Sequence, residues 1–332
     1  MHFKKLGNTD FRLSTIGLGT WAIGGSGYDY GWGTQDDKDS IDTIRKAVDV
    51  GINWIDTAPI YGLGHSEEIV GQAIKGIRDK VVVSTKCGFC WDDNKRIYNC
   101  LKKQSIRREV EDSLRRLDIE VIDLYQIHKP LPDEDIEEAW MELNRFVEEG
   151  IVRCVGVSSF NLQQLKRVQQ IHPVSFIQNV YSIIQNETEE EGILDYCADN
   201  NIGVVCYSPM GSGLLTGKFT KEKVAALPPD DWRLKDAYFF QEPDLSANLE
   251  LVEMLRPIAE RNNKTLAQLA IAWVIRKPEV TSAIVGARKP HQIEQTAPGG
   301  DWMLSEQDKA DLDAVVTAHH AKLKKLKEKD AG

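Results

Sequence analysis

Eight short apolar runs, each followed by a stretch of helical periodicity, constrain this 332-residue chain more than any other feature. Most of the runs lack the polar alternation of a half-exposed strand, which indicates parallel strands buried on both faces. Eight β-then-α units predict an α/β fold, a closed (β/α)8 TIM barrel, rather than an open sheet. The runs cover residues 15–19, 52–56, 81–86, 121–128, 152–159, 174–180, 203–208 and 281–286.

The helical stretches between the runs carry signals for where they begin. Asp36, Ser66 and Ser105 are expected to be the N-caps of the first three helices, because their side chains can accept a hydrogen bond from the first turn. Further helices are expected over 136–149, 162–170, 189–200, 265–277 and 290–297.

The remaining segments are expected to pack around the barrel, so that a single domain spans 1–332. An open dinucleotide-binding sheet would show a GxGxxG turn after an early strand, and GLGTWAIGG does not have that spacing. Residues 209–247 are too long for a plain connection and predict a loop that folds over the barrel top. A β-hairpin cap at the N-terminus and two extra helices, over 248–262 and 305–327, complete the predicted fold.

Composition narrows the class of protein. The formal net charge of -10 disfavours nucleic acid as the main ligand, because phosphate binding needs clustered Lys and Arg. No apolar run approaches the length of a membrane span, and MHFKKLGNTDF lacks the apolar segment of a signal peptide. Six cysteines in a chain this long do not suggest a disulfide scaffold. We therefore expect a cytoplasmic protein with no membrane or nucleic-acid partner.

Polar side chains fall at the carboxyl ends of the predicted strands, where (β/α)8 barrels carry their active sites. Each alone has an ordinary interpretation as a turn, cap or loop residue, but their shared position at one end of a barrel indicates a site. The candidates are Asp56, Tyr61, Lys86, His128, Ser158, Ser159, Gln178, Tyr207, Ser208, Gly286 and Arg288.

The first four candidates favour proton delivery to a carbonyl group. A lysine buried at the end of a barrel strand needs a partner, and Asp56 can supply it to Lys86. The ammonium is expected to lower the pKa of the Tyr61 phenol, which would make it a proton donor near neutrality. His128 can donate to the same oxygen, and no second ligand at metal spacing accompanies it, so we expect no metal site.

These residues lie in motifs that resemble the aldo-keto reductases over almost the whole chain. The resemblance implies a catalytic tetrad of Asp56, Tyr61, Lys86 and His128, with Tyr61 as general acid. It is closest to the bacterial group that includes the Bacillus general stress and inositol-operon reductases. The matching stretches are GLGT (17–20), DTAPIYG (56–62), GHSEEIVG (64–71), STK (84–86), EDSLRRLDIEVIDLYQIH (111–128), GVSSF (156–160), YSPMGSGLLTGK (207–218) and VGARKPHQI (285–293).

The same resemblance implies a nicotinamide cofactor across the barrel top. Arg288, helped by Lys289, is placed to meet a 2′-phosphate, which favours NADPH over NADH. The chain departs from the family pattern at Ser159 and Thr296, where asparagine is usual. The residues implied to hold the nicotinamide are Ser158, Ser159, Gln178 and Tyr207, and the remaining contacts are Ser208, Met210, Gly211, Ser212, Leu214, Lys218, Gly286, Gln292 and Thr296.

Loop aromatics and a CxxC motif add two further expectations. Aromatic walls would suit aldehydes and ketones with apolar or flat substituents, and the candidate pocket residues are Trp21, Trp32, Trp91 and Trp232. Cys87 and Cys90 follow a strand with no helix beginning at once, which favours loop cysteines over a dithiol catalyst.

The predicted function is NADPH-dependent reduction of aldehydes or ketones to alcohols, on a small-molecule carbonyl substrate. Two alternatives remain open. One is an alcohol, sugar or polyol dehydrogenase that runs in the oxidative direction, and the other is a cofactor-sensing binding subunit with little turnover. A monomer is the family default, with an assembly left open.

Overall fold

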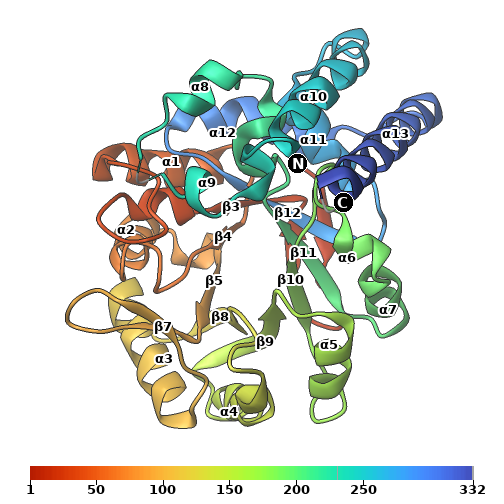
Figure 1. Ribbon diagram of the computed structural model, residues 1–332. Helices are drawn as coiled ribbons and strands as arrows, with labels where there is room; N and C mark the ends of the chain where they lie inside the picture. Colours follow the sequence, from red (N-terminus) through yellow and green to blue (C-terminus); the bar gives the residue numbers. More distant parts are fainter. Residues whose placement is uncertain (230, 331–332) are drawn as a thin grey trace.

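A closed barrel of eight parallel strands forms the centre of the computed structural model, which describes residues 1–229 and 231–330 (Figure 1). The strands follow one another around the barrel in the order β10-β11-β12-β3-β4-β5-β8-β9. Each predicted apolar run supplies one strand, so the predicted (β/α)8 fold is confirmed. The strands are β3 (Ile16–Gly19), β4 (Trp54–Asp56), β5 (Val82–Cys87), β8 (Ile122–Ile127), β9 (Val152–Ser158), β10 (Phe176–Val180), β11 (Gly203–Tyr207) and β12 (Val280–Gly286).

Helices surround the barrel because the strands are apolar on their outer face as well as their inner face (Figure 1). The helix expected over 189–200 is divided in two at Gly192, which has a φ of 74°. In the part of the chain that the structure describes, no helix combines the length and apolarity needed to span a membrane. The surrounding helices are α1 (Asp37–Asp49), α2 (His65–Ile74), α3 (Lys103–Leu117), α4 (Ile136–Glu148), α5 (Leu162–Gln169), α6 (Glu187–Glu190), α7 (Ile193–Asp199), α11 (Leu266–Ile275) and α12 (Pro290–Thr296).

One of the three predicted N-caps is confirmed. The Asp36 carboxylate accepts from the Asp39 backbone N–H at 2.8 Å and caps α1. The other two predictions are wrong, because α2 and α3 begin before Ser66 and Ser105. Ser66 is fully buried and donates instead to the Thr20 hydroxyl at 2.8 Å.

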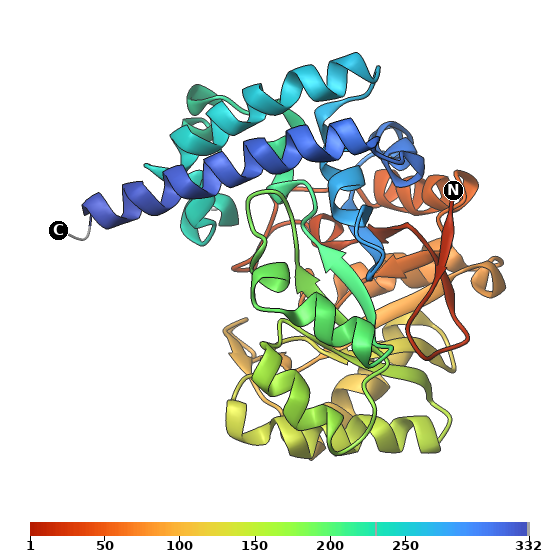
Figure 2. The ribbon, with the colours of Figure 1, turned by 90° about the vertical axis from the view of Figure 1, so that its right-hand side faces the viewer.

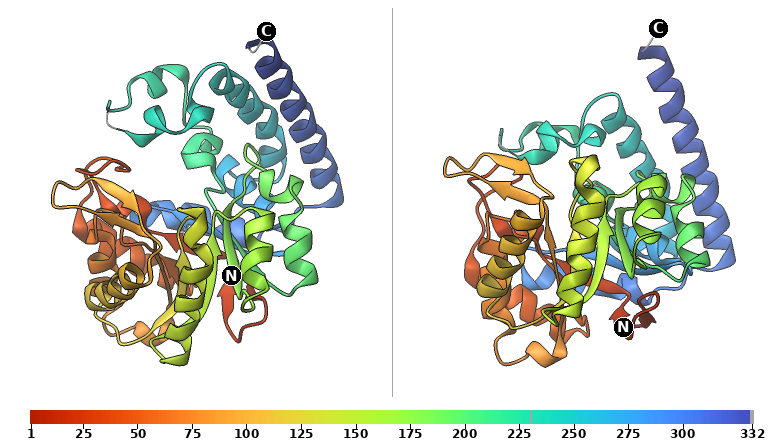
Figure 3. Two further views of the ribbon diagram at one scale, coloured as in Figure 1. Left: turned by 60° about the horizontal axis from the view of Figure 1, so that its bottom comes forward. Right: turned by 90° about the horizontal axis from the view of Figure 1, so that it is seen from below.

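The N-terminal hairpin closes one end of the barrel (Figure 3). Its strands, β1 (Phe3–Lys5) and β2 (Arg12–Ser14), pair antiparallel. Leu6 and Leu13 pack with Trp54 in an apolar cluster. Gly17 allows this packing, since a Cβ there would meet the Trp54 ring at 2.1 Å. The predicted cap is confirmed, and apolar side chains fill this end of the barrel.

The segment 209–247 lies at the opposite end, and it is not a bare loop (Figure 3). It contains η4 (Gly211–Thr216), α8 (Lys221–Ala225), α9 (Trp232–Lys235) and η5 (Tyr238–Phe240). The two extra helices are α10 (Asp244–Arg261), which begins earlier than predicted, and α13 (Glu306–Asp330). They run beside each other outside the barrel (Figure 2).

A buried histidine lies on the inner face of α13. His319 is 1% exposed, and neither ring nitrogen has a hydrogen-bond partner among the described residues. Burial lowers the pKa of this imidazole to about 4, with smaller contributions from His320 and Lys322, while Glu250 acts in the opposite sense. The folded chain therefore binds a proton at His319 less readily than the unfolded chain does.

We predict that this histidine destabilises the protein as the pH falls from about 6.5 towards a pKa of about 4. The unfolded chain takes up the proton first, so stability rises with pH across this window. The free energy of unfolding of His319→Leu, measured relative to that of the wild type, should be about 2 kcal/mol higher at pH 5 than at pH 8. Urea unfolding at both pH values measures this difference, and an equal change at both would contradict it.

Candidate active site

The carboxyl end of the barrel brings together the four side chains predicted to be catalytic. Asp56 ends β4, Lys86 lies near the end of β5, and His128 directly follows β8. These three strands are neighbours in the barrel. Tyr61 lies in the turn between β4 and α2, where it reaches back over the strand ends.

Asp56 and Lys86 form a buried ion pair, as predicted. The Lys86 Nζ lies 2.8 Å from the Asp56 Oδ2, and the two side chains are 0% and 4% exposed. Lys86 also donates to the backbone oxygen of Thr57 at 2.8 Å. The second carboxylate oxygen of Asp56 accepts from the Gln178 amide at 2.8 Å. Strands on opposite sides of the barrel thus fix the position of the lysine.

The Tyr61 hydroxyl is the third acceptor of the Lys86 ammonium, after Asp56 and Thr57. It is 3.4 Å from the Lys86 Nζ, and its ring stacks on Trp21 with 6.1 Å between centroids. Desolvation raises the pKa of Tyr61 well above its usual value, and the charge of Asp56 raises it further. The expectation of a lowered pKa is therefore wrong, because burial and the charge of Asp56 both act to raise it. The phenol remains protonated at neutral pH.

His128 completes the group from the other side of Tyr61. The two rings meet edge to face with 5.8 Å between centroids. Burial lowers the pKa of His128 well below its usual value, and Lys86 and Lys129 lower it further. The imidazole is neutral at pH 7 and carries one N–H donor.

A hairpin that the sequence analysis missed lies over this group. Its strands are β6 (Phe89–Trp91) and β7 (Ile97–Asn99). The Phe89 ring packs 4.9 Å from the His128 ring, so it helps to hold the imidazole in place. The apolar run FCW directly after the fifth barrel strand was the available signal, but three residues are too few for a periodicity argument.

The CxxC cysteines are enclosed by the same hairpin. Cys87 ends β5 and is buried, and Cys90 lies in β6 with its sulfur 3.2 Å from the Ser105 hydroxyl. Burial raises the pKa of Cys87 well above its usual value, and that of Cys90 to about 12. Thiols with raised pKa values are poor nucleophiles. These side chains therefore fit loop packing better than dithiol chemistry.

Three of the four predicted pocket tryptophans form one cluster beside Tyr61. The Trp21 ring lies 5.3 Å from Trp32 and 4.7 Å from Trp232. Trp91 lies apart on β6, where it lines a cavity of about 460 Å³ together with Gly62 and Leu63. The barrel mouth thus has an aromatic wall on one side and a separate hollow next to the turn that carries Tyr61.

Comparison with known proteins identifies this arrangement. A sequence profile described as Aldo/keto reductase family matches residues 15–317. The chain belongs to the aldo/keto reductase family. It is 40% identical over 319 residues to "Aldo-keto reductase YhdN" of Bacillus subtilis (strain 168), an alignment that covers 95% of this chain and 94% of the relative. The predicted resemblance to a Bacillus-type bacterial group is thereby confirmed.

Two further relatives have more specific names. The chain is 38% identical over 317 residues to "NADH-specific methylglyoxal reductase" of Escherichia coli (strain K12), covering 91% of this chain and 94% of that one. Among solved structures, the glycerol dehydrogenase AKR11B4 from Gluconobacter oxydans superposes with a TM-score of 0.85 at 37% identity. That alignment covers 96% of this chain and 95% of the other.

Three of the positions predicted to hold a nicotinamide lie on adjacent strands of this aldo-keto reductase. Ser158 and Tyr207 end β9 and β11, and Gln178 lies in the middle of β10 between them. Gly286, predicted as a further contact, ends β12. Among the described residues, the Ser159 hydroxyl has only long contacts, 3.5 Å to the Ser158 hydroxyl and 3.4 Å to the Tyr207 hydroxyl. A carboxamide would therefore find hydroxyl groups that are not tightly bound within the protein.

The turn after β11 contains repeated left-handed backbone conformations. Within it, the backbone N–H groups of Gly211 and Gly213 donate to the backbone oxygens of Ser208 and Met210 at 2.9 and 3.1 Å. The residues with positive φ are Ser208 (56°), Gly211 (53°), Ser212 (53°) and Gly213 (96°).

The other predicted contact positions differ in what they can offer. Leu214 is fully buried in the core, and Met210 packs partly against the same core, so both would contact a cofactor through the backbone. Lys218 is exposed. The Thr296 hydroxyl donates to the Gln292 backbone oxygen at 2.9 Å, so it is already bonded within α12.

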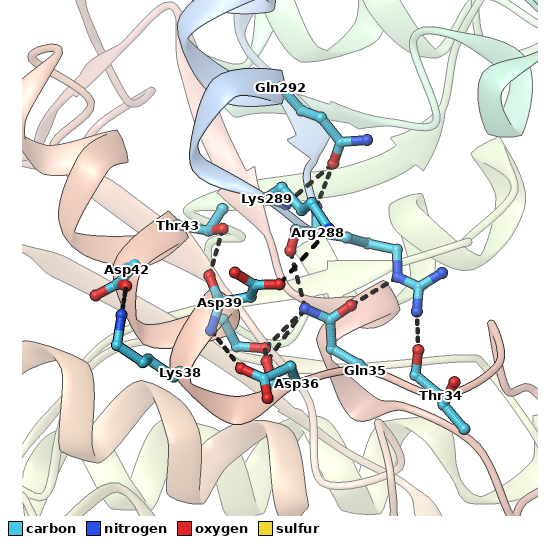
Figure 4. A network of polar contacts seen from close by, with 11 residues as sticks. Thr34, Gln35, Asp36, Lys38, Asp39, Asp42, Thr43, Arg288, Lys289 and Gln292 are labelled. Carbon is cyan, nitrogen blue, oxygen red and sulfur yellow. Dashed lines mark hydrogen bonds and ion pairs between the residues drawn. The ribbon is translucent and has the colours of Figure 1, made fainter.

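Arg288 lies where the resemblance predicts it, just after β12, but its guanidinium contacts residues 32–35 of the chain itself (Figure 4). Gln292 orients this turn, because its side-chain oxygen accepts from the backbone N–H of residues 288 and 289 at 2.7 and 3.1 Å. Within the described residues, no group of three or more His, Cys, Asp or Glu side chains could hold a metal ion.

We predict that Asp56→Asn will destabilise the protein by about 3 kcal/mol, because it leaves the buried Lys86 charge without its carboxylate. Lys86→Met in the same chain should restore part of this loss. Urea unfolding of both single variants and the double variant measures the coupling. If the two losses simply add, the ion pair makes no contribution of its own.

Proposed function

We propose that this aldo-keto reductase reduces aldehydes or ketones to alcohols with a reduced nicotinamide dinucleotide, which supplies the hydride when bound. The observation that carries the proposal is the Tyr61 hydroxyl, 3.4 Å from a lysine that a buried carboxylate holds in place. A proton donor at the mouth of the barrel, beside a neutral imidazole donor, matches what a carbonyl oxygen needs as it gains negative charge.

Each of the four residues has a separate task in this proposal. Tyr61 donates its proton to the carbonyl oxygen, and its raised pKa means that the proton is present throughout the neutral range. Lys86 stabilises the phenolate that remains, through their 3.4 Å contact. Asp56 keeps the lysine charged, and the His128 N–H orients the carbonyl oxygen.

The dinucleotide would lie across the ends of β9 to β12. Hydroxyl groups of Ser158 and Ser159 and the side-chain oxygen of Gln178 are the groups that would hold the carboxamide. The Gln178 amide nitrogen is bonded to Asp56, which leaves its oxygen to accept a carboxamide N–H. Tyr207 would face the nicotinamide ring, and the turn over residues 208–213 would lie over the pyrophosphate.

The substrate would be a small carbonyl compound held against the aromatic cluster of Trp21, Trp32 and Trp232. The name of the E. coli relative, a methylglyoxal reductase, supports a small dicarbonyl substrate. The structural relative named as a glycerol dehydrogenase favours alcohol oxidation as a second candidate. The raised pKa of Tyr61 favours reduction at neutral pH, because oxidation needs the phenol to have lost its proton.

The choice of dinucleotide is the finer part of the proposal. The expectation of NADPH depends on Arg288, whose guanidinium is bonded to residues 32–35. The E. coli relative is NADH-specific by name. We therefore propose that this chain accepts NADH at least as readily as NADPH.

We predict that Tyr61→Phe lowers the turnover of an activated aromatic aldehyde by about 10²–10⁴-fold, because it removes the general acid. Absorbance of NADH and NADPH measures turnover, and quenching of tryptophan fluorescence measures binding, which should persist in the variant. Tyr98→Phe is the matched control, since Tyr98 is 50% exposed.

Two outcomes would contradict this proposal. Full turnover by Tyr61→Phe would mean that another group delivers the proton. Dinucleotide binding by the wild type without turnover on a broad carbonyl panel would instead favour a cofactor-sensing subunit.

A further inference from the structure

Gln35 uses both ends of its side-chain amide to hold Arg288. Its Oε1 accepts from the Arg288 Nε at 2.7 Å, and its Nε2 donates to the Arg288 backbone oxygen at 2.9 Å (Figure 4). The same Nε2 lies 3.0 Å from the Ser40 hydroxyl, which anchors the amide to α1. Gln35 therefore holds both the backbone and the guanidinium of Arg288, which lies 253 positions later in the chain.

The rest of the guanidinium is bonded to the same short segment. Its NH1 donates to the Trp32 backbone oxygen at 3.2 Å, and its NH2 donates to the Thr34 backbone oxygen. All three nitrogens of Arg288 thus face residues 32–35. Bidentate recognition of a phosphate requires two neighbouring N–H donors in the plane of the guanidinium.

The other cations around this position are also paired. Arg233 donates to the Asp231 carboxylate through two nitrogens, at 2.8 and 2.6 Å, and it stacks over Trp32 at 4.9 Å. The Lys289 Nζ lies 3.8 Å from the Asp39 carboxylate.

The first turn of α1 adds negative charge close to the same place. Asp36, Asp37 and Asp39 lie together there (Figure 4 shows two of them beside Gln35). The Asp37 carboxylate faces His65 at 2.9 Å, which leaves Asp36 and Asp39 beside Gln35. A phosphate group, with a charge of about -1.5 to -2, would be repelled by these two carboxylates.

We propose that Gln35 is a specificity-determining residue, which favours NADH over NADPH by keeping Arg288 bonded to residues 32–35. This inference rests on the proposed function, because it concerns the adenosine end of the dinucleotide described there. The segment occupies the Nε N–H and one N–H of each terminal nitrogen, so a 2′-phosphate can reach only the second N–H of NH1 and of NH2 unless the Gln35–Arg288 hydrogen bond breaks. A 2′-hydroxyl has no such requirement, so NADH binds without disturbing the segment.

The test is to titrate the intact protein with NADH and with NADPH, and to compare the two dissociation constants by quenching of tryptophan fluorescence. The wild type should bind NADH more tightly. Gln35→Ala removes the hydrogen bond to the Arg288 Nε and leaves only the bonds to two backbone oxygens. It should lower the Kd for NADPH about tenfold relative to that for NADH, the scale of one hydrogen bond to a charged group. Gln35→Glu pairs the arginine with a carboxylate and should raise the relative Kd for NADPH by about as much.

Asp42→Asn is the matched control. Asp42 carries the same charge as Asp39 on α1, but its partner is Lys38 at 2.7 Å, away from Arg288. This variant should leave the ratio of the two constants unchanged, which separates the effect of Gln35 from the general field of the helix.

The outcomes distinguish this inference from the proposed function. A wild type that binds NADPH more tightly, or Gln35 variants that shift both constants equally, would overturn the role of Gln35 while leaving a nicotinamide-dependent reductase. Failure of both dinucleotides to bind would contradict the proposed function itself.

Discussion

The buried ion pair between Asp56 and Lys86 is the interaction on which the rest of the site depends. A lysine with no exposed surface needs a compensating charge, and the 2.8 Å contact provides it. The same pair positions Nζ at the Tyr61 hydroxyl, and it is tied to the nicotinamide side of the barrel through Gln178. One polar contact therefore links the proposed proton donor to the proposed cofactor cleft.

The two ends of the barrel have different roles: one end stabilises the fold, and the other carries the polar side chains of the site. At one end, Trp54 and the N-terminal hairpin fill the interior with apolar side chains. At the other end, the strands finish in polar residues that the loops partly enclose. This enclosure raises the pKa of Tyr61 and lowers that of His128, so both groups keep the protonation states that carbonyl reduction requires.

The sequence was sufficient for the barrel and for the position of the four central residues, because both depend on local patterns repeated along the chain. It was insufficient for features that depend on contacts between residues far apart in the chain. The pKa of Tyr61 depends on how completely water is excluded, which no spacing reports. Arg288 and Gln35 are 253 positions apart, so their hydrogen bond has no local signal. The short strands of the β6–β7 hairpin fall below the length at which periodicity is informative.

The pH dependence of the first turnover tests the central claim most directly. With dinucleotide and aldehyde saturating, the rate of hydride transfer should be constant from about pH 6 to about pH 9, because Tyr61 stays protonated and His128 stays neutral throughout. A rate that declines above an apparent pKa of about 8 would contradict this account. It would mean that Lys86 lowers the pKa of the phenol despite its burial.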